Sequence, residues 1–268
     1  MVSGKFSNHT SLESQVVGPD TFCWVDFTLD NEIKSPHLYY QINNFYTSHR
    51  NFAKSLSRSQ LRGNELDDPS DSCKPAEEVS DMLTWQQQNL NGGALDADDP
   101  SHPCGSIAKY YFSDTFEVYD NNDDSDTFDD TTKNTLKQSD ISHSYDESKF
   151  KNIQEDGDTV DDWKDKQWLD LSQGTVKVWF QMETDFDFKK LNGKLEDDLK
   201  ADNKYTILID STWDGHEFGA EKSIFITEIN FLGGPNPWMG IYFLSAGFFS
   251  LVATIAYTII YCIKRRKE

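Results

Sequence analysis

The sequence predicts a mainly β protein that carries one membrane-spanning helix near its C-terminus. Several short runs alternate polar and apolar residues, which is the pattern of half-buried strands. A long uncharged apolar segment lies close to the end of the chain, and its length suits a bilayer. We therefore expect an antiparallel, β-sandwich-like ectodomain with short helices and a polar insertion, followed by a transmembrane helix.

The apolar segment includes 23 consecutive positions without a charged residue, from Ile241 to Ile263. At about 1.5 Å rise per residue, a helix of this length crosses the roughly 30 Å hydrocarbon core of a bilayer. A buried core helix is the alternative, but such helices are usually shorter and amphipathic, whereas this segment is apolar on every face. Aromatic residues mark its two ends: Trp238, Tyr242, Tyr257 and Tyr261.

Basic residues at 264–267 follow the apolar segment at once, and such clusters favour the cytoplasmic side of a membrane. We predict a transmembrane helix at 238–263, a basic cytoplasmic tail at 264–268 and an extracytoplasmic ectodomain at 21–237. Residues 1–20 contain no apolar run that could act as a signal peptide. We therefore expect a disordered or incomplete N-terminus, or else an inverted topology. A glycan on Asn8, in the sequon Asn8-His9-Thr10, would decide between the two topologies.

Local patterns predict the elements of the ectodomain. The segment 39–61 has apolar residues at helical intervals, such as Ile42, Phe45 and Phe52, and predicts an amphipathic helix packed on the sheet. Asp214 and Gly215 stand between two strand-like runs and predict a hairpin turn. Strands are predicted where alternation coincides with strand-favouring residue types, at 22–29, 175–180, 205–210 and 223–231.

Residues 120–157 are rich in Asp, Ser, Thr and Asn and poor in aliphatic side chains. We predict an acidic, solvated and partly disordered insertion here. Its acidic run resembles a calcium-binding loop only superficially, because Ser125 and Thr131 stand where such a loop needs glycine and a bidentate glutamate.

The charge balance excludes several functions. Residues 1–237 carry 21 basic and 45 acidic residues, a net charge of −24, because four bases and one acid belong to the tail. Such a domain is unsuited to nucleic acid, which requires clustered Lys and Arg. The sequence also lacks paired metal-ligating histidines, Cys-x-x-Cys, a phosphate-binding loop and a nucleophile elbow. His216 beside Asp214 and Glu217 could form a metal or acid/base cluster, but Asp214-Gly215 is more typical of a hairpin turn. We therefore expect no enzyme, no metal and no cofactor.

The four cysteines differ in context. Cys73 and Cys104 bracket a polar stretch, and a bridge closing this 31-residue separation would contribute roughly 3 to 4 kcal/mol in the chain-entropy model. Two free buried thiols are the alternative. Cys23 is left unpaired, which suggests an intermolecular bond or a partner outside this chain. Cys262 lies at the inner membrane boundary, as apolar filler or as a palmitoylation candidate.

Several blocks of residues resemble a known family. Cys23 with Phe27-Thr28-Leu29 is similar to a C-x-x-x-F-T-L strand, and 39–50 is similar to a Y-Y-x-L-x-N-F-Y-Q-N-H-R block that continues through 54–61. Residues 103–116 resemble P-C-G-x-I-A-x-x-x-F-N-D-T-F, and 178–191 keep the spacing of V-W-M-R through F-R-K-L. The stretch 232–241 resembles W-x-G-G-K-N-x-F-L-G-I-A. These blocks are those of the cell-division-cycle protein 50 (ligand-effect modulator 3) family, the accessory β subunits of type IV P-type ATPases that flip phospholipids.

This chain departs from the family pattern at several positions. Ser113 replaces the asparagine of the N-D-T sequon, Pro235 replaces a lysine, and 181–186 differ from the family's A-A-L-P stretch. The family has two membrane helices, so the chain resembles a member that lacks the first, together with the cysteine that would pair with Cys23. The resemblance also implies that Cys73 and Cys104 form the family's disulfide.

The resemblance implies a non-catalytic accessory subunit and chaperone for exit from the endoplasmic reticulum. Its partner would be a type IV P-type ATPase in a heterodimer, surrounded by membrane lipids. The protein would be integral to a membrane of the secretory pathway (endoplasmic reticulum, Golgi, plasma membrane or endosome), with a lumenal or extracellular ectodomain. The alternative is a tail-anchored adaptor with a cytosolic acidic domain. Candidate partner contacts are Tyr39, Tyr40, Asn44, Phe45, Tyr46, His49, Arg50, Trp179, Phe188, Lys189, Gly233, Gly234, Asn236 and Trp238.

Overall fold

The computed structural model describes residues 2–6, 15–17, 20–121, 132–155, 158–159, 161–215, 218–229 and 237–266. The chain divides into two compact units, Met1–Thr227 and Glu228–Glu268. The first unit holds the β-sheets and the short helices, and the second holds one long helix. The predicted class, mainly antiparallel β with short helices and one long apolar C-terminal helix, is therefore confirmed.

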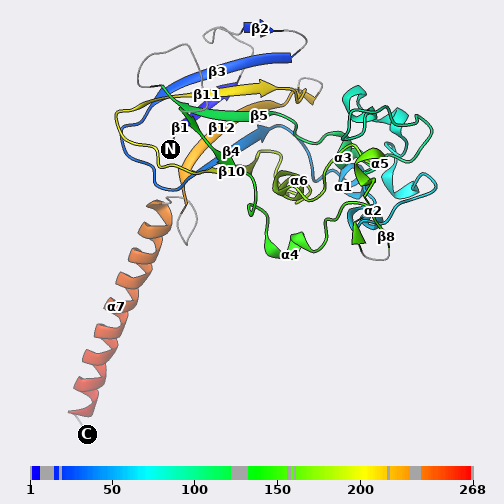
Figure 1. Cartoon of the computed structure of the whole chain (residues 1–268). Helices are drawn as coiled ribbons and strands as arrows, with labels where there is room; N and C mark the ends of the chain where they lie inside the picture. The colour runs from blue at the N-terminus through cyan, green and yellow to red at the C-terminus, as the bar shows by residue number, and fades with distance from the viewer. Residues whose placement is uncertain are drawn as a thin grey trace. The chain divides into compact units, whose positions relative to one another are not determined.

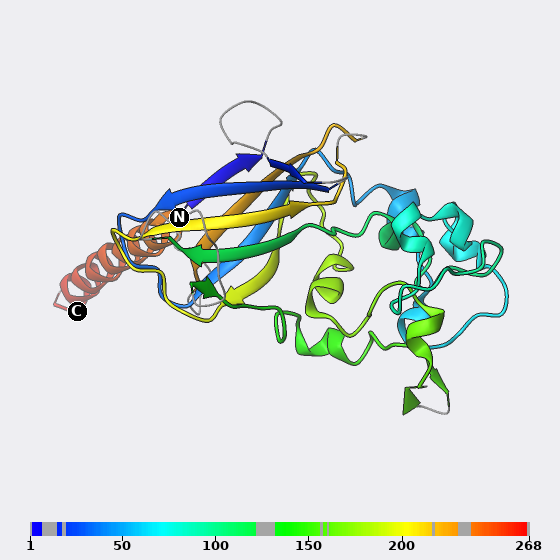
Figure 2. The same cartoon turned by 45° about the horizontal axis from the view of Figure 1, so that its top comes forward.

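Two five-stranded sheets form the body of the first unit, as far as the described residues define it. They lie face to face in Figures 1 and 2. The first sheet has the order β1 (Val2–Phe6), β12 (Glu221–Glu228), β4 (Pro36–Asn43), β10 (Phe188–Leu195), β7 (Leu136–Lys137). The second has the order β2 (Gln15–Val17), β3 (Asp20–Thr28), β11 (Lys204–Ser211), β5 (Thr115–Asp120), β6 (Lys133–Asn134).

The core lies between the two sheets, because alternate residues of the central strands face inward. In β4 the buried positions include Leu38, Tyr40 and Ile42, and in β11 they include Ile207 and Ile209. All five belong to one contiguous cluster of buried apolar side chains. Each such aliphatic side chain contributes about 1.5 to 3 kcal/mol on full burial, so this alternation fixes which face of each strand turns inward.

The predicted helix at 39–61 is wrong in its first part. Residues up to Asn43 continue β4, which pairs antiparallel with β10 in the register Tyr40↔Lys190. Leu38, Tyr40 and Ile42 also recur at every second position, which is the pattern of a strand. The strand forms because this pattern buries all three side chains against the core. The strand ends before Asn44, whose φ of 61° is left-handed. Only α1 (Arg50–Lys54) and α2 (Arg58–Leu61) are helical.

The predicted strand at 175–180 is also wrong, because this segment forms the helix α6 (Gly174–Trp179). Its residues 176–179 are buried at every position, so the short helix is enclosed on all sides. A helix that is enclosed in this way has no polar face, so its sequence lacks the usual helical pattern. Val176 and Val178, two positions apart, then give the alternation that is typical of a strand.

The predicted hairpin turn at Asp214 and Gly215 is a third correction. The strands on either side, β11 and β12, belong to different sheets and do not pair with each other. The segment after Ser211 therefore crosses from one sheet to the other. The predicted strands at 22–29, 205–210 and 223–231 agree with β3, β11 and β12 within their described residues.

Short helices gather at one end of the sandwich, in a region that we call the helical lobe (residues 50–109 and 161–171), seen beyond the strand ends in Figures 1 and 2. A disulfide between Cys73 and Cys104 joins two of its segments, with Cα atoms 5.6 Å apart. The remaining short helices are η1 (Asp71–Cys73), η2 (Val79–Asp81), η3 (Thr84–Gln87), α3 (Ser106–Lys109), α4 (Ser144–Glu147) and α5 (Trp163–Lys166).

The acidic insertion predicted at 120–157 is ordered in much of its described part. Residues 132–155 supply edge strands to both sheets and the helix α4, and β8 (Gln154–Glu155) pairs with β9 (Asp158–Thr159). Ile153 and Asn134 are buried. The acidic run at 122–131 lies outside the described residues.

The second unit contains the helix α7 (Pro237–Arg265), which is 29 residues long. Its span from Trp238 to Arg265 is long and apolar enough to cross a membrane, and the mean hydropathy of its most apolar 18-residue stretch is 1.9. None of the apolar side chains in its most hydrophobic stretch is buried within the protein. That exposure is expected of a helix whose natural solvent is lipid.

Candidate partner-binding surface

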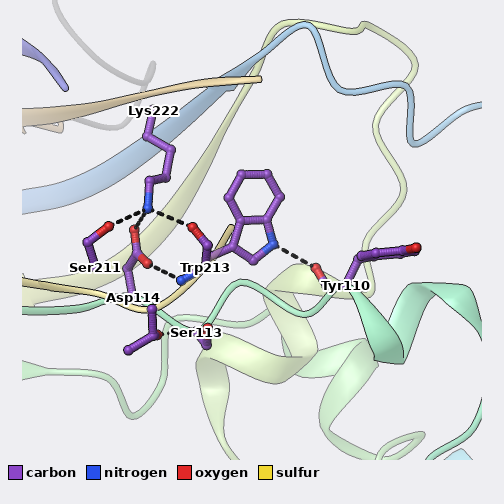
Figure 3. Close-up of polar contacts among 7 residues, drawn as sticks. Tyr110, Ser113, Asp114, Ser211, Trp213 and Lys222 are labelled. Atoms are coloured by element: carbon purple, nitrogen blue, oxygen red, sulfur yellow. Dashed lines mark hydrogen bonds and ion pairs between the residues drawn. The ribbon is translucent and has the colours of Figure 1, made fainter. Parts of the chain in front are cut away.

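An ion pair between a buried aspartate and a partly buried lysine joins the two sheets close to the helical lobe. Lys222 on β12 donates to Asp114 Oδ2 at 2.6 Å, and Asp114 directly precedes β5 in the other sheet. The same ammonium group donates to Ser211 Oγ at 2.8 Å and to the Trp213 carbonyl at 2.9 Å, which Figure 3 shows. All three donors of Lys222 are thus used inside the protein.

Asp114 is held on its other oxygen as well. The Trp213 backbone N–H donates to Asp114 Oδ1 at 2.7 Å, and the Trp213 indole N–H donates to the Tyr110 carbonyl at 3.1 Å. Burial raises the pKa of the Asp114 carboxyl, and Lys222 opposes that rise. Ser113, which replaces the sequon asparagine, shares a hydrogen bond with the Thr212 hydroxyl at 2.8 Å. The cluster is therefore a structural joint between the sheets.

A second network surrounds the disulfide and explains why the lobe has a fixed shape. Ser55 Oγ donates to the Cys73 carbonyl at 2.8 Å and accepts from the Ser106 N–H at 2.7 Å. Gln60 donates to the Ser101 carbonyl at 2.8 Å and accepts from the Cys104 N–H at 3.0 Å. Both side chains are buried, and each donates one hydrogen bond and accepts another. They connect the segments on each side of the disulfide.

Four of the predicted partner contacts are core residues instead. Tyr40, Phe45, Trp179 and Phe188 are all buried at 5% exposure or less. Phe45 lies at the centre of an aromatic cluster, with ring centroids 5.6 Å from Trp213 and 6.3 Å from Trp179. Aromatic rings in such a cluster stabilise the fold through their buried apolar area and their edge-to-face contacts. They cannot contact a partner unless the core itself unpacks.

Tyr46 is a predicted contact whose aromatic side chain is exposed on the surface of the first unit. Its side chain is 58% exposed and stacks on Phe186, which is itself 46% exposed, with centroids 5.5 Å apart. Three hydrogen bonds join the two segments that carry this pair. They run from Asn44 N–H to Asp187 Oδ1 at 2.8 Å, from Phe45 N–H to the Phe186 carbonyl at 3.0 Å, and from Thr47 Oγ1 to the Glu183 carbonyl at 3.1 Å.

A buried lysine supports this segment from inside. Lys190 on β10 is 3% exposed and donates to the Val178 carbonyl at 2.9 Å, to the Gln181 carbonyl, and to Glu183 Oε1 at 3.2 Å. Burial lowers the pKa of Lys190, and Glu183 opposes that decrease. The lysine satisfies carbonyls at the end of α6, so the loop that follows the helix is fixed in place.

The other predicted positions are dispersed. Tyr39 is half-buried, whereas His49 and Arg50 are exposed. Asn44 donates to the Gly219 carbonyl at 3.2 Å, and the Lys189 ammonium lies 3.7 Å from the Phe225 ring centroid. Trp238, 78% exposed, lies in the first turn of α7 in the second unit. Four predicted site residues lie outside the described residues: Asn8, Gly233, Gly234 and Asn236.

Cys23 is the remaining predicted site residue. Cys23 is a half-buried free cysteine on β3, opposite Ile209, and burial raises the pKa of its thiol.

Sequence reasoning missed Met182 and Phe186, which are 38% and 46% exposed. The available signal was that 181–186 departs from the family pattern, with Met182 next to Glu183 and Phe186 between two aspartates.

Within the residues that the structure describes, no group of three or more His, Cys, Asp or Glu side chains is placed to hold a metal ion. The fold and surface together define a β-sandwich protein that carries a candidate membrane anchor and a rigidly mounted, exposed aromatic pair. A family model described as the LEM3 (ligand-effect modulator 3) family / CDC50 family matches residues 4–267. The chain belongs to this family.

Three relatives illustrate the similarity. The chain is 30% identical to ALA-interacting subunit 3 of Arabidopsis thaliana, over 92% of this chain and 66% of the relative. It is 28% identical to cell cycle control protein 50A of Mus musculus, over 89% and 68% respectively. It is 26% identical to phospholipid-transporting ATPase accessory subunit LEM3 of Saccharomyces cerevisiae, over 84% and 54%. The chain therefore spans just under two thirds of the plant relative's length.

Proposed function

We propose that this chain is the non-catalytic accessory subunit of a phospholipid-transporting P-type ATPase. The family match over residues 4–267 carries the proposal, and a relative named as the accessory subunit of such an ATPase supports it. In this role the chain binds the ATPase as a heterodimer, accompanies it out of the endoplasmic reticulum and supports its lipid transport. The reaction itself belongs to the ATPase.

The physical properties of the first unit suit such a role. The sandwich is joined by the Asp114–Lys222 ion pair, and its lobe contains a disulfide and two buried hydrogen-bonding side chains. These interactions hold its surface residues in fixed positions. A preorganised surface loses little conformational freedom on binding, so more of the contact energy appears as affinity. A stiff surface can also favour one conformation of its partner, which is how a non-catalytic subunit influences a transport cycle.

We propose that residues 21–237 lie in the lumen or outside the cell, that 238–263 cross the membrane and that 264–268 face the cytosol. The disulfide supports this orientation, because disulfides persist in oxidising compartments. Asn8 is then available for glycosylation. We expect an endoglycosidase to shift the mobility of the chain expressed in its host cells, and an Asn8→Gln variant to lack that shift.

Co-expression tests the function directly. The tagged full chain is expressed with each phospholipid-transporting P-type ATPase of its source genome and purified in mild detergent. We expect one ATPase to co-purify in stoichiometric amount and to leave the endoplasmic reticulum only when this chain is present. If no ATPase binds and the reduced domain is digested by protease added from the cytosolic side, the chain is a tail-anchored adaptor and the proposal fails.

A further inference from the structure

The surface next to β4 and β10 carries large apolar side chains that no other part of the described chain covers. Tyr46, Met182 and Phe186 are 58%, 38% and 46% exposed, and they come from two segments that are hydrogen-bonded to each other. We call residues 44–47 and 182–187 the aromatic platform. Single exposed apolar residues are ordinary, but an exposed, stacked aromatic pair is the kind of group that anchors protein interfaces.

The platform is built to keep its shape. Its two segments are joined by the hydrogen bonds of Asn44, Phe45 and Thr47, and the buried Lys190 fixes the loop at Glu183. Phe45, directly beside Tyr46 in sequence, is anchored in the aromatic core. The exposed rings are therefore held by buried structure, so ordering them costs little when a partner binds.

The electrostatic setting of the platform determines which partner fits. Asp185 and Asp187 are exposed on it, and the positive charge of Lys190 is buried beneath it. Arg50, four residues after Tyr46 in sequence, is also exposed, but residues 1–237 carry a net charge of −24. Such a field repels anionic lipid headgroups and acidic proteins and attracts basic segments. An aromatic pair beside carboxylates also suits a Lys or Arg side chain, which can lie over a ring.

We infer that the aromatic platform is the docking site for a basic segment on the extracytoplasmic side of the ATPase. That segment presents at least one Lys or Arg next to an apolar side chain. The apolar group packs against Tyr46, Phe186 and Met182, and the cation faces the rings and the aspartates. This inference rests on the proposed function, because it takes the ATPase as the partner.

The first test removes the aromatic pair. The Tyr46→Ser/Phe186→Ser variant of the full chain is co-expressed with the ATPase that the wild-type chain retains. Trp85→Ser is the matched control, because Trp85 is 45% exposed but lies on η3 in the helical lobe. We expect the double variant to recover at least tenfold less ATPase, while the control recovers wild-type amounts. Both variants should keep the wild-type melting temperature within a few degrees, because the removed rings are exposed.

The second test changes only the sign of a charge on the platform. Met182→Lys and Met182→Glu replace the same exposed side chain with charged groups of similar length. A basic partner is repelled by the lysine and tolerates the glutamate, so Met182→Lys should recover several-fold less ATPase than Met182→Glu. Equal recovery of the ATPase by the two variants, or the reverse order, overturns the inference that the docking segment is basic.

The outcomes separate the two levels of the proposal. If the wild-type chain retains no ATPase, the proposed function fails, whatever the variants do. If the wild-type chain retains the ATPase and the double variant retains it equally, the function stands and the platform is not the docking site. If Trp85→Ser loses as much ATPase as the double variant, the loss is not specific to the platform, and the inference is likewise overturned.

Discussion

Gly105 shows at the scale of one residue why the lobe requires glycine beside its disulfide. Its φ is +103°, and an added Cβ would lie 2.1 Å from the Ser55 carbonyl oxygen. Ser55 is the residue whose hydroxyl joins Cys73 to Ser106, so the close approach is part of that network. A side chain at 105 would force these segments apart.

We predict that Gly105→Ala destabilises the protein strongly, because it combines an unfavourable φ with a backbone clash. Gly92→Ala is the matched control, since Gly92 also has a positive φ (+81°) but nothing within 4 Å of its added Cβ. The control should lose about 1 to 2 kcal/mol, the backbone term alone. Gly105→Ala should lose clearly more, or fail to accumulate. Thermal unfolding of the full chain in detergent measures the difference, and similar losses would contradict the clash.

His102 is a buried residue with an unsatisfied polar atom. Its side chain is 3% exposed, and Nε2 has no hydrogen-bond partner among the described residues. Burial lowers the pKa of this imidazole from 6.5 to about 4. The unfolded chain therefore binds more protons than the folded chain between these two values, and stability falls as the pH falls from about 6.5 towards 4.

We predict that the lowered pKa of His102 decreases the free energy of unfolding by about 2 kcal/mol when the pH falls from 7 to 5. The reason is that the unfolded chain binds the proton more readily than the folded chain. The measurement is the melting temperature of the full chain in detergent at both pH values. Other titrating groups contribute to the wild-type change, so the decisive quantity is its difference from a His102→Gln variant. This variant should lose less stability on acidification. The prediction fails if the two proteins show the same pH dependence.

At the scale of elements, the Asp114–Lys222 pair is the joint between the sheets. Its residues are 108 positions apart in sequence: Lys222 lies on β12 in one sheet, and Asp114 directly precedes β5 in the other. A buried pair of this kind is seldom worth more than a well-packed apolar pair, but removing one partner leaves a buried charge unpaired. The loss on single substitution is therefore much greater than the net value of the pair.

We predict that Lys222→Met destabilises the protein by about 3 to 5 kcal/mol, because Asp114 keeps its buried position without its cation. Lys189→Met is the matched control, since Lys189 is an exposed lysine on β10, and it should change stability by less than about 1 kcal/mol. An Asp114→Leu/Lys222→Met double variant should recover part of the loss. Denaturant or thermal unfolding measures the stability of all three variants. If Lys222→Met loses no more stability than Lys189→Met, the Asp114–Lys222 pair does not act as a joint between the sheets.

At the scale of the whole molecule, charge governs association. Residues 1–237 carry a net charge of −24, which sets the long-range field around the first unit. Salt shortens the range of this field, from about 10 Å at 0.1 M to about 3 Å at 1 M. Binding to a basic partner surface should therefore weaken with salt, whereas the stability of the buried core should not.

We predict that raising NaCl from 0.1 M to 1 M lowers the recovery of the ATPase on the tagged chain several-fold. The salt dependence should be smaller for Met182→Lys, which carries a positive charge on the platform. The control is the melting temperature of the chain alone, which should not fall over the same range. Recovery that stays constant or rises with salt would indicate an interface dominated by apolar contact.

Much of the architecture was predictable because its signals are local. The uncharged run from Ile241 to Ile263 defines a candidate span by length alone, and the alternating residues of 205–210 define β11. The segments 39–49 and 175–180 were mispredicted because short apolar runs satisfy more than one period. Burial in the assembled core selected the strand in one case and the helix in the other.

The candidate site was less predictable than the fold. Tyr46 is exposed while its neighbour Phe45 is buried, and composition does not distinguish the two. Phe186 became part of the surface only because the hydrogen bonds between 44–47 and 182–187 bring it to Tyr46. The joint between Asp114 and Lys222 left no local pattern at all.

The sequence by itself determined the mainly β class, the candidate membrane span, the acidic character of the first unit and the blocks that mark the family. These properties depend on composition, period and short motifs, which can be read without knowing what lies nearby in space. Only the tertiary structure decided which aromatic residues face water, which lysines are buried and which sheet each strand joins. Those outcomes depend on contacts between segments far apart in the chain, and only packing selects among such contacts.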